Sequence, residues 1–304
     1  MSAITLVGEG MVELSCVDEA RTDWRLGTGG DTLNTAIHLA RFGDTVHYLT
    51  ALGDDPFSEE LRAAWIAEGI DPALMLTAPG TMPGLYAIRT DAAGERSFSY
   101  WRGESAARQA FALPGSAAAL AEAERSDLLA FSLISLAILP DAGREALLAL
   151  AARMKSAGRQ VAFDGNYRAR LWADASEAQA WRDRAVGCCT IGLPTWEDER
   201  MIGAEECAHA TAARWEALGA KEVVVKLGED GCLLPGGHTM PPPEKLAPRD
   251  TSGAGDAFNA GYLHARMAGA SPQAAALAGH RLAGWVVMRP GAVPPRDDAS
   301  VYDY

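Results

Sequence analysis

Residues 250–263 are the most informative stretch of this chain, and they read Asp-Thr-Ser-Gly-Ala-Gly-Asp-Ala-Phe-Asn-Ala-Gly-Tyr-Leu. After Asp256, apolar residues recur at helical spacing, which predicts a helix that is buried along one face. Gly253 and Gly255 place a backbone without β-carbons at the start of this helix, where unpaired N–H groups and the helix dipole favour an anion. A carboxylate among these groups is unfavourable unless it has a task. Asp256 could accept the proton of a hydroxyl that attacks a phosphoryl group.

Two interpretations of this stretch are open on its residues alone. One is an ordinary glycine-rich helix start, with Asp256 as a first-turn residue. The other is a site of phosphoryl transfer, in which Asp256 is the base and the N–H groups of Gly253, Ala254 and Gly255 form an anion hole.

A second stretch, residues 29–36, reads Gly-Gly-Asp-Thr-Leu-Asn-Thr-Ala, and glycines follow it at positions 43 and 53. The two stretches, in this order, resemble the two signatures of the ribokinase-like (PfkB-type) carbohydrate kinases. The resemblance implies a single ribokinase-like α/β domain over residues 1–304, with three layers and a mostly parallel sheet. It also implies a small β-rich lid over the sugar.

The periodicity of the chain independently predicts strands that alternate with helices, which is typical of a mostly parallel sheet with ligands at the carboxyl ends of its strands. The expected strands are residues 4–7, 46–51, 128–133, 161–163, 222–226 and 232–234. The expected helices are residues 34–42, 56–68 with Leu61, Trp65 and Ile66 on one face, 142–157 capped by Asp141 and ended by Gly158, and one opened by Ser271 and Pro272. Gly8-Glu9-Gly10 lacks the third glycine of a dinucleotide fingerprint, which favours a strand-end turn over NAD binding.

Residues 71–104 differ in character, because turn signals separate alternating runs there. This pattern predicts antiparallel hairpins rather than strand–helix units. The family resemblance implies that these hairpins and residues 10–27 together form the lid. Exposed edges of such strands predict a homo-oligomer.

The composition excludes several classes of partner. The chain has 27 basic and 40 acidic residues and a net charge of −13, which argues against nucleic acid and anionic membranes. The five cysteines form no Cys-x-x-Cys pair, which favours reduced thiols in a cytoplasmic protein. No signal peptide or membrane span is expected.

The nucleotide side of the site is predicted less directly. Residues 226–231 read Lys-Leu-Gly-Glu-Asp-Gly, and by residue type alone they favour a hairpin turn. The family resemblance instead lays this loop, with Lys226, Gly228 and Gly231, along ATP, and brings Asn166 close to it. Asp198 follows Thr195 at the spacing of the family's Asn-x-x-Glu motif. This implies a contact with Mg²⁺ through water, although an acidic helix start explains Asp198 equally. A monovalent cation near Asp250 is a further possibility.

Two arginines indicate the kind of sugar. Arg102 ends an expected lid strand, and Arg168 follows an expected sheet strand. Guanidinium groups bind a carboxylate in a fork, so a pocket with both arginines suits a sugar acid and disfavours a neutral sugar. Taken singly, each arginine is also explained as a surface residue, and Arg168 could face the phosphates of ATP.

Six segments together resemble the 2-keto-3-deoxygluconate kinases within this family, and they are residues 8–15, 29–34, 83–86, 100–102, 134–139 and 166–172. The resemblance extends from about residue 4 to about residue 296. That resemblance implies ATP-dependent phosphorylation of the C6 hydroxyl of 2-dehydro-3-deoxy-D-gluconate, in the Entner–Doudoroff and uronate-degradation routes. It assigns the sugar site to Gly30, Asn34, Tyr86, Tyr100, Arg102 and Arg168. A kinase for another sugar, or a sugar-binding regulator without turnover, stays open as an alternative.

Overall fold

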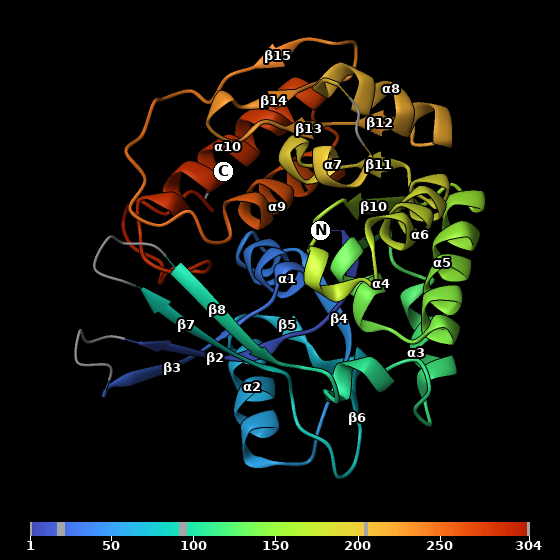
Figure 1. Ribbon diagram of the computed structural model, residues 1–304, viewed down its shortest axis with the longest axis vertical. Coiled ribbons are helices and arrows are strands. Elements are labelled where there is room, and N and C mark those ends of the chain that lie inside the picture. The colour runs from blue at the N-terminus through green and yellow to red at the C-terminus, as the bar shows by residue number, and fades with distance from the viewer. Residues whose placement is uncertain (1, 17–21, 91–95, 204–205, 303–304) are drawn as a thin grey trace.

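A parallel sheet forms the centre of the molecule in the computed structural model, which describes residues 2–16, 22–90, 96–203 and 206–302 (Figure 1). In these residues the sheet has eight strands, with the order β12-β11-β10-β9-β1-β4-β5 and with β6 paired to β4. Each of these pairs is parallel. The strands are β1 (Ala3–Val7), β4 (Thr45–Leu52), β5 (Ile70–Asp71), β6 (Met75–Thr77), β9 (Leu128–Ser132), β10 (Gln160–Asp164), β11 (Ile191–Gly192) and β12 (Glu222–Val223).

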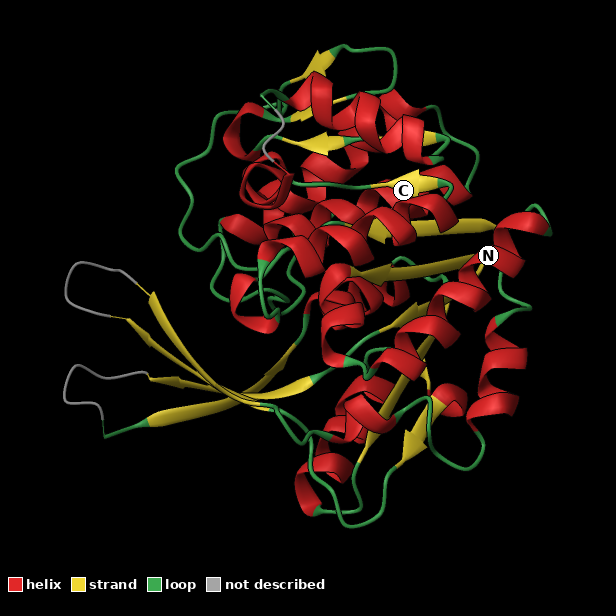
Figure 2. Ribbon diagram, turned by 45° about the vertical axis from the view of Figure 1, so that its right-hand side comes forward, coloured by secondary structure: helices red, strands yellow, loops and turns green. Residues whose placement is uncertain are grey.

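Helices cover both faces of this sheet, which confirms the predicted three-layer α/β fold (Figures 1 and 2). One layer contains α1 (Asp31–Arg41), α2 (Pro56–Ala67), α9 (Ala254–Met267) and α10 (Pro272–Val287). The other contains α3 (Ser116–Ala123), α4 (Leu133–Ile138), α5 (Asp141–Ser156), α6 (Ala175–Cys188), α7 (Trp196–Gly203) and α8 (Ala208–Leu218).

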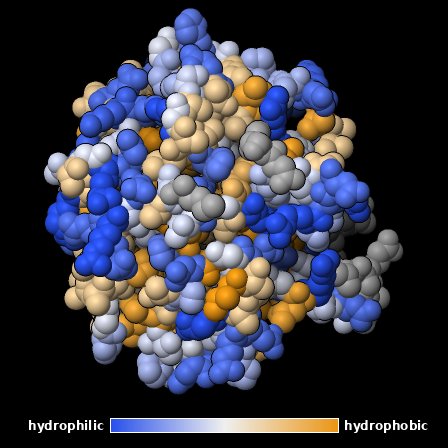
Figure 3. Space-filling model, turned by 180° about the vertical axis from the view of Figure 1, so that it is seen from behind, coloured by the Kyte–Doolittle hydropathy of each residue, from blue (hydrophilic) through white to orange (hydrophobic). Residues whose placement is uncertain are grey.

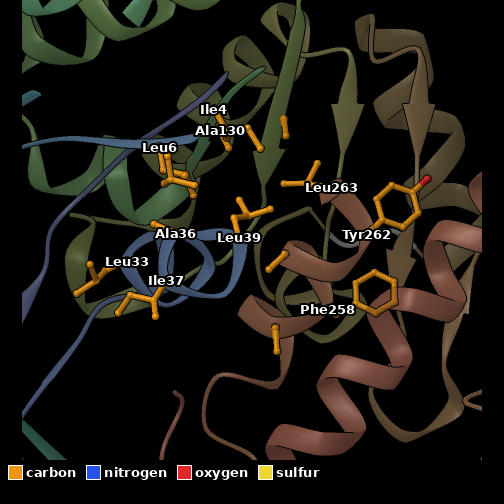
Figure 4. Packing of buried hydrophobic residues seen from close by; sticks show 14 of the residues in the cluster. Ile4, Leu6, Leu33, Ala36, Ile37, Leu39, Ala130, Phe258, Tyr262 and Leu263 are labelled. Carbon is orange, nitrogen blue, oxygen red and sulfur yellow. The ribbon is translucent and has the colours of Figure 1, made fainter. Parts of the chain in front are cut away.

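Two hydrophobic cores follow from the period-two alternation of the strands. In β9, Leu128 and Ala130 pack toward α1 and α9, whereas Leu129 and Phe131 pack toward α5 and α6. Figure 4 shows the first of these cores, with side chains from β1, β9, α1 and α9. The cores hold the carboxyl ends of the strands beside the starts of α1 and α9.

A smaller sheet extends outward from this body, as Figure 2 shows. Its order is β3-β2-β7-β8, with the strands β2 (Met11–Cys16), β3 (Trp24–Gly29), β7 (Leu85–Thr90) and β8 (Arg96–Trp101). We call it the lid sheet. β7 and β8 form one antiparallel hairpin within the range where hairpins were expected, and β2 and β3 form a second one outside it. A parallel pairing of β2 with β7 joins the two hairpins. Residues 71–77 were expected in the lid, but they belong to β5, a short 3-10 helix and β6, and both of these strands pair with β4 in the central sheet.

A third sheet is antiparallel and contains β13 (Val225–Lys226), β14 (Cys232–Leu233) and β15 (Thr239–Met240). The expected strand 222–226 is therefore divided at Val224. Its first half extends the parallel sheet, and its second half begins this hairpin. The change of direction brings Lys226 toward the start of α9.

The helices differ from the expectations in three ways: one start, one cap and one buried face. The helix α1 begins at Asp31, three residues early. Asp141 is the first residue of α5 and no side chain caps that helix, because Pro140 occupies the capping position. Ile66 is 44% exposed, although Leu61 and Trp65 are buried. Ser271 caps α10 by accepting a hydrogen bond from the Ala274 N–H at 3.3 Å, as predicted.

The surface seen from behind in Figure 3 intersperses hydrophilic and hydrophobic residues, as is ordinary for a protein surface. Within the described ranges, no helix combines the length and the apolar character needed to cross a membrane. Cys188, Cys189, Cys207 and Cys232 are free thiols.

Candidate active site

A cavity of about 1280 Å³ lies at the carboxyl ends of the sheet strands, between the lid sheet and the start of α9. It brings together nearly all the predicted site residues, which come from segments far apart in the chain. Those that line it are Gly30, Asn34, Tyr86, Tyr100, Arg102, Asn166, Arg168, Asp198, Lys226, Gly228, Gly253, Ala254, Gly255 and Asp256. Arg102, next to the lid sheet, and Asp256, on α9, thus line one shared space.

Gly231 is the one predicted residue outside the lining of this cavity. Its φ angle is 96°, and a β-carbon there would lie 2.1 Å from the backbone oxygen of Met240. The turn between β13 and β14 therefore requires glycine for a structural reason. A role of Gly231 toward the nucleotide stays a prediction.

The start of α9 has the geometry of an anion-binding site. Gly253 precedes the helix with φ 70°, and a β-carbon there would lie 2.5 Å from the β-carbon of Ala292. The N–H of Ala254 bonds to the oxygen of Thr251 at 3.3 Å, whereas the N–H groups of Gly253 and Gly255 find no acceptor in the described part of the chain. These free donors, at the positive end of the helix dipole, suit a phosphoryl group.

Asp256 lies in the first turn of α9 and is 9% exposed. Burial, followed by the charge of Asp31, raises its pKa to about 8, although the hydrogen bond from Asn34 acts in the opposite direction. The Asn34 Nδ2 donates to the Asp256 Oδ2 at 2.8 Å, which fixes the carboxyl group. A carboxyl group with a pKa near the working pH is well suited to accept a proton from a hydroxyl.

Gly30 lets α1 start close to the end of β1. A β-carbon at Gly30 would lie 2.2 Å from the backbone oxygen of Glu9, so only glycine fits. This close approach sets Asn34 one turn further along α1, where it reaches Asp256. Asp31, between them, accepts a hydrogen bond from the Asn166 Nδ2 at 3.2 Å.

Two tyrosines from the lid sheet line the same cavity. The rings of Tyr86 and Tyr100 stack with centroids 5.7 Å apart, because the two residues are directly opposite in the β7–β8 register. The Tyr86 hydroxyl donates to Glu13. Burial and the charge of Glu13 raise the pKa of Tyr86 strongly, so its hydroxyl stays protonated.

Arg102 forms a buried ion pair with Glu9, whose side chain is 1% exposed. The Arg102 side chain is 10% exposed and lines the cavity. A guanidinium group has five N–H donors, so one carboxylate partner leaves donors for an anionic ligand. The pairing also explains how this cation is tolerated in a buried position.

Arg168 is half-exposed and also lines the cavity. Its Nη1 donates to the Tyr167 oxygen at 2.6 Å and lies 3.6 Å from the Asp198 Oδ1. Asp198 also accepts the Tyr167 N–H at 3.2 Å, and burial raises the pKa of Asp198. Thr195 pairs with Lys226 through an isolated β-bridge.

A metal ion would find few protein ligands at this site. In the residues that the structure describes, no group of three or more His, Cys, Asp or Glu side chains could hold a metal ion. Mg²⁺ needs only one or two carboxylates when phosphates and water complete its shell. Asp198, which lines the cavity, fits that modest requirement.

Five residues of the site were missed from the sequence: Glu9, Glu13, Asp31, Asp164 and Arg170. Four of them line the cavity as acids, and the Arg170 guanidinium lies 4.3 Å from the centroid of the Tyr100 ring. A usable signal existed for Glu9 and Asp164, since each stands at or just after the carboxyl end of a central strand.

The fold and the site together define a carbohydrate kinase. The chain matches the family described as pfkB family carbohydrate kinase over residues 1–299, and it therefore belongs to that family. This confirms the expectation from the two glycine-rich stretches.

Known proteins add detail. A relative from Escherichia coli (strain K12), named 2-dehydro-3-deoxygluconokinase, is 42% identical over 304 residues, which cover 97% of each chain. One from Dickeya dadantii (strain 3937), with the same name, is 39% identical over 302 residues and 96% of each chain. The crystal structure of a PfkB protein from Polaromonas sp. JS666 has a TM-score of 0.82 and 26% identity, and the match covers 93% of this chain and 94% of that one.

Proposed function

We propose that this chain is an ATP-dependent kinase that converts 2-dehydro-3-deoxy-D-gluconate to 2-dehydro-3-deoxy-6-phospho-D-gluconate and ADP. The observation that carries the proposal is the shared cavity, in which Asp256 and the free N–H groups of α9 face two arginines. The name and the 42% identity of the E. coli relative support the same substrate.

The chemical step begins at Asp256. Its carboxylate takes the proton of the C6 hydroxyl, and the C6 oxygen then attacks the γ-phosphorus of ATP. The bond from that phosphorus to the bridging oxygen breaks, and ADP leaves with the bonding electrons. The hydrogen bond from Asn34 keeps the carboxyl group oriented for this transfer.

The start of α9 stabilises the negative charge of the transferring phosphoryl group. The N–H groups of Gly253 and Gly255 point donors at it, and the dipole of the helix adds to their effect. Because these donors are fixed by the backbone, they need no reorganisation during the reaction.

The arginines of the cavity select a sugar acid as the substrate. Arg102 and Arg168 supply positive charge for the carboxylate of the substrate, and Tyr86 and Tyr100 form a wall along the sugar. A neutral sugar would leave the arginines without an anionic partner, so fructose should be a poor substrate. Gly30 and Asn34, which line the same cavity, would hold the sugar hydroxyls.

ATP would lie along Asn166, Lys226 and Gly228, which line the same cavity. Mg²⁺ would be held by the phosphates, water and Asp198, and it would neutralise charge on the phosphates. A monovalent cation near Asp250 belongs to the same proposal. Asp250 accepts the N–H groups of Ser252 and Gly291 at 2.8 and 2.7 Å, and so joins two loops of the cavity.

The proposal includes a homo-oligomeric, cytoplasmic enzyme. Leu26 and Trp101 on the lid sheet are 48% and 61% exposed, and large exposed apolar side chains on open strand edges favour pairing between subunits. Light scattering coupled to size-exclusion chromatography tests the assembly, since a monomer at working concentration would refute it.

A substrate panel tests the function. ADP release is measured with ketodeoxygluconate, ketodeoxygalactonate, gluconate and fructose, each with ATP and Mg²⁺. We expect ketodeoxygluconate to give the highest kcat/KM. A preference for fructose would identify a kinase for another sugar, and no ADP release with any substrate would indicate a binding protein.

A further inference from the structure

Lys226 is held by two buried side chains that the proposed function has not used. Its Nζ donates to the Asp164 Oδ1 at 2.9 Å and to the Asn259 Oδ1 at 3.2 Å. The Asn259 Nδ2 in turn donates to the Asp164 Oδ2 at 2.7 Å. The three side chains thus form a closed ring of hydrogen bonds, and each residue is less than 10% exposed.

The ring joins three secondary-structure elements next to the start of α9. Asp164 ends β10, Lys226 ends β13, and Asn259 lies on α9 itself, one turn after Asp256. A β-carbon placed on Gly255 would lie 3.8 Å from the Lys226 Nζ. The ammonium group is therefore next to the helix start that carries the free N–H donors.

The ring leaves one N–H donor of the Lys226 ammonium group unused. An ammonium group has three donors, and the ring uses two of them. Lys226 lines the cavity, so the third donor can meet a ligand there. Burial of an unpaired ammonium group is costly, and the carboxylate of Asp164 offsets that cost.

We infer that Asp164 is a positioning residue for phosphoryl transfer. Together with Asn259, it fixes the Lys226 ammonium group beside Gly255, where the remaining N–H meets the transferring phosphoryl group. The inference rests on the proposed kinase function. It assigns Asp164 a role that acts through Lys226 and needs no contact between Asp164 and the substrate.

A double-mutant cycle tests this role. Wild type, Asp164→Asn, Lys226→Met and the double variant are compared in kcat with ketodeoxygluconate and ATP. We expect Asp164→Asn to lower kcat about 100-fold, which is typical of a misplaced group, with the KM for the sugar changed less than about twofold. In the Lys226→Met background the same substitution should cost less than about threefold, because Asp164 acts through the missing ammonium group.

Asp44→Asn is the matched control. Asp44 is also a buried carboxylate, and it accepts a hydrogen bond from the His264 Nδ1 at 2.7 Å near the other end of α9. The substitution Asp44→Asn should change kcat only slightly, and by the same factor in wild type and in Lys226→Met. Circular dichroism and thermal unfolding verify that each variant is folded.

The outcomes separate the two proposals. If wild type releases no ADP with ketodeoxygluconate, the proposed function fails. If wild type is active and Asp164→Asn costs the same factor with and without Lys226, the role of Asp164 is overturned. If Lys226→Met falls below detection, the cycle is run on the affinity for ADP with aluminium fluoride, a mimic of the transferring phosphoryl group. The same coupling is expected there, and independent effects would equally overturn the role.

Discussion

The substitution Asp256→Asn should make the protein more stable at high pH while it removes the proposed catalytic base. Asp256 is 9% exposed, and burial together with the charge of Asp31 raises its pKa from 3.8 to about 8. Between these two values the unfolded chain has released this proton, whereas the folded protein keeps it. Asp256 therefore lowers the stability increasingly as the pH rises from 3.8 to 8. Asparagine does not titrate and retains an oxygen that can accept the hydrogen bond from Asn34.

The magnitude follows from the two pKa values. Each pH unit between them is worth about 1.4 kcal/mol, so the full cost above pH 8 is about 6 kcal/mol. At pH 5 only about 1.2 of the roughly 4 units have been passed, which leaves a cost of about 2 kcal/mol. The stability gained by Asp256→Asn should therefore grow by about 4 kcal/mol between pH 5 and pH 9.

Urea unfolding of wild type and Asp256→Asn at pH 5 and pH 9 measures this difference. Asp44→Asn, which removes another buried carboxylate, is the control for the loss of a charge. In parallel, kcat of Asp256→Asn should fall about 10²–10⁴-fold. The reasoning is refuted if the stability difference between the two proteins is the same at both pH values, or if Asp256→Asn turns over at a near-normal rate.

Three further predictions concern the rest of the cavity. Arg102→Ala should raise the KM for ketodeoxygluconate about 10- to 100-fold, since a hydrogen bond to a charged group is worth about 1.5–3 kcal/mol, and should leave the KM for ATP unchanged. Steady-state kinetics check this against Arg89→Ala, an exposed lid arginine outside the cavity, and equal effects of both variants would contradict it. Gly253→Ala should cost more stability than Gly269→Ala in chemical unfolding, because both residues have positive φ but only a β-carbon at Gly253 would strike Ala292. Gly253→Ala should also lower kcat, whereas Gly269→Ala should not. Removal of Mg²⁺ with EDTA should abolish ADP release, and added Mg²⁺ should restore it; activity that persists in EDTA would contradict a metal requirement.

The central fold could be predicted from the sequence because its strands and helices are long and strongly periodic. The strand at residues 4–7 and the helix after Asp256 are examples, and both lie close to their expected bounds. The prediction failed for residues 71–77 and at Val224. The strands there are only two or three residues long, so tertiary pairing rather than local pattern decides which sheet they join.

The candidate site was predictable where a motif fixed both the residue and its neighbourhood. Gly253 and Asp256 are examples, because the helix start determines what surrounds them. The partners Glu9 and Asp164 were missed, since an ion pair between distant segments depends on how the strands end against one another in space. No spacing along the chain relates Glu9 to Arg102.

In the proposed mechanism, Asp256 deprotonates the C6 hydroxyl of a sugar acid whose carboxylate is bound by Arg102. A crystal structure with ketodeoxygluconate and a non-hydrolysable ATP analogue tests it most directly. The C6 oxygen should lie about 2.6–3.2 Å from the Asp256 carboxylate, with the substrate carboxylate at Arg102. A complex in which the carboxylate faces the start of α9 and the C6 hydroxyl is turned away from Asp256 would contradict the claim.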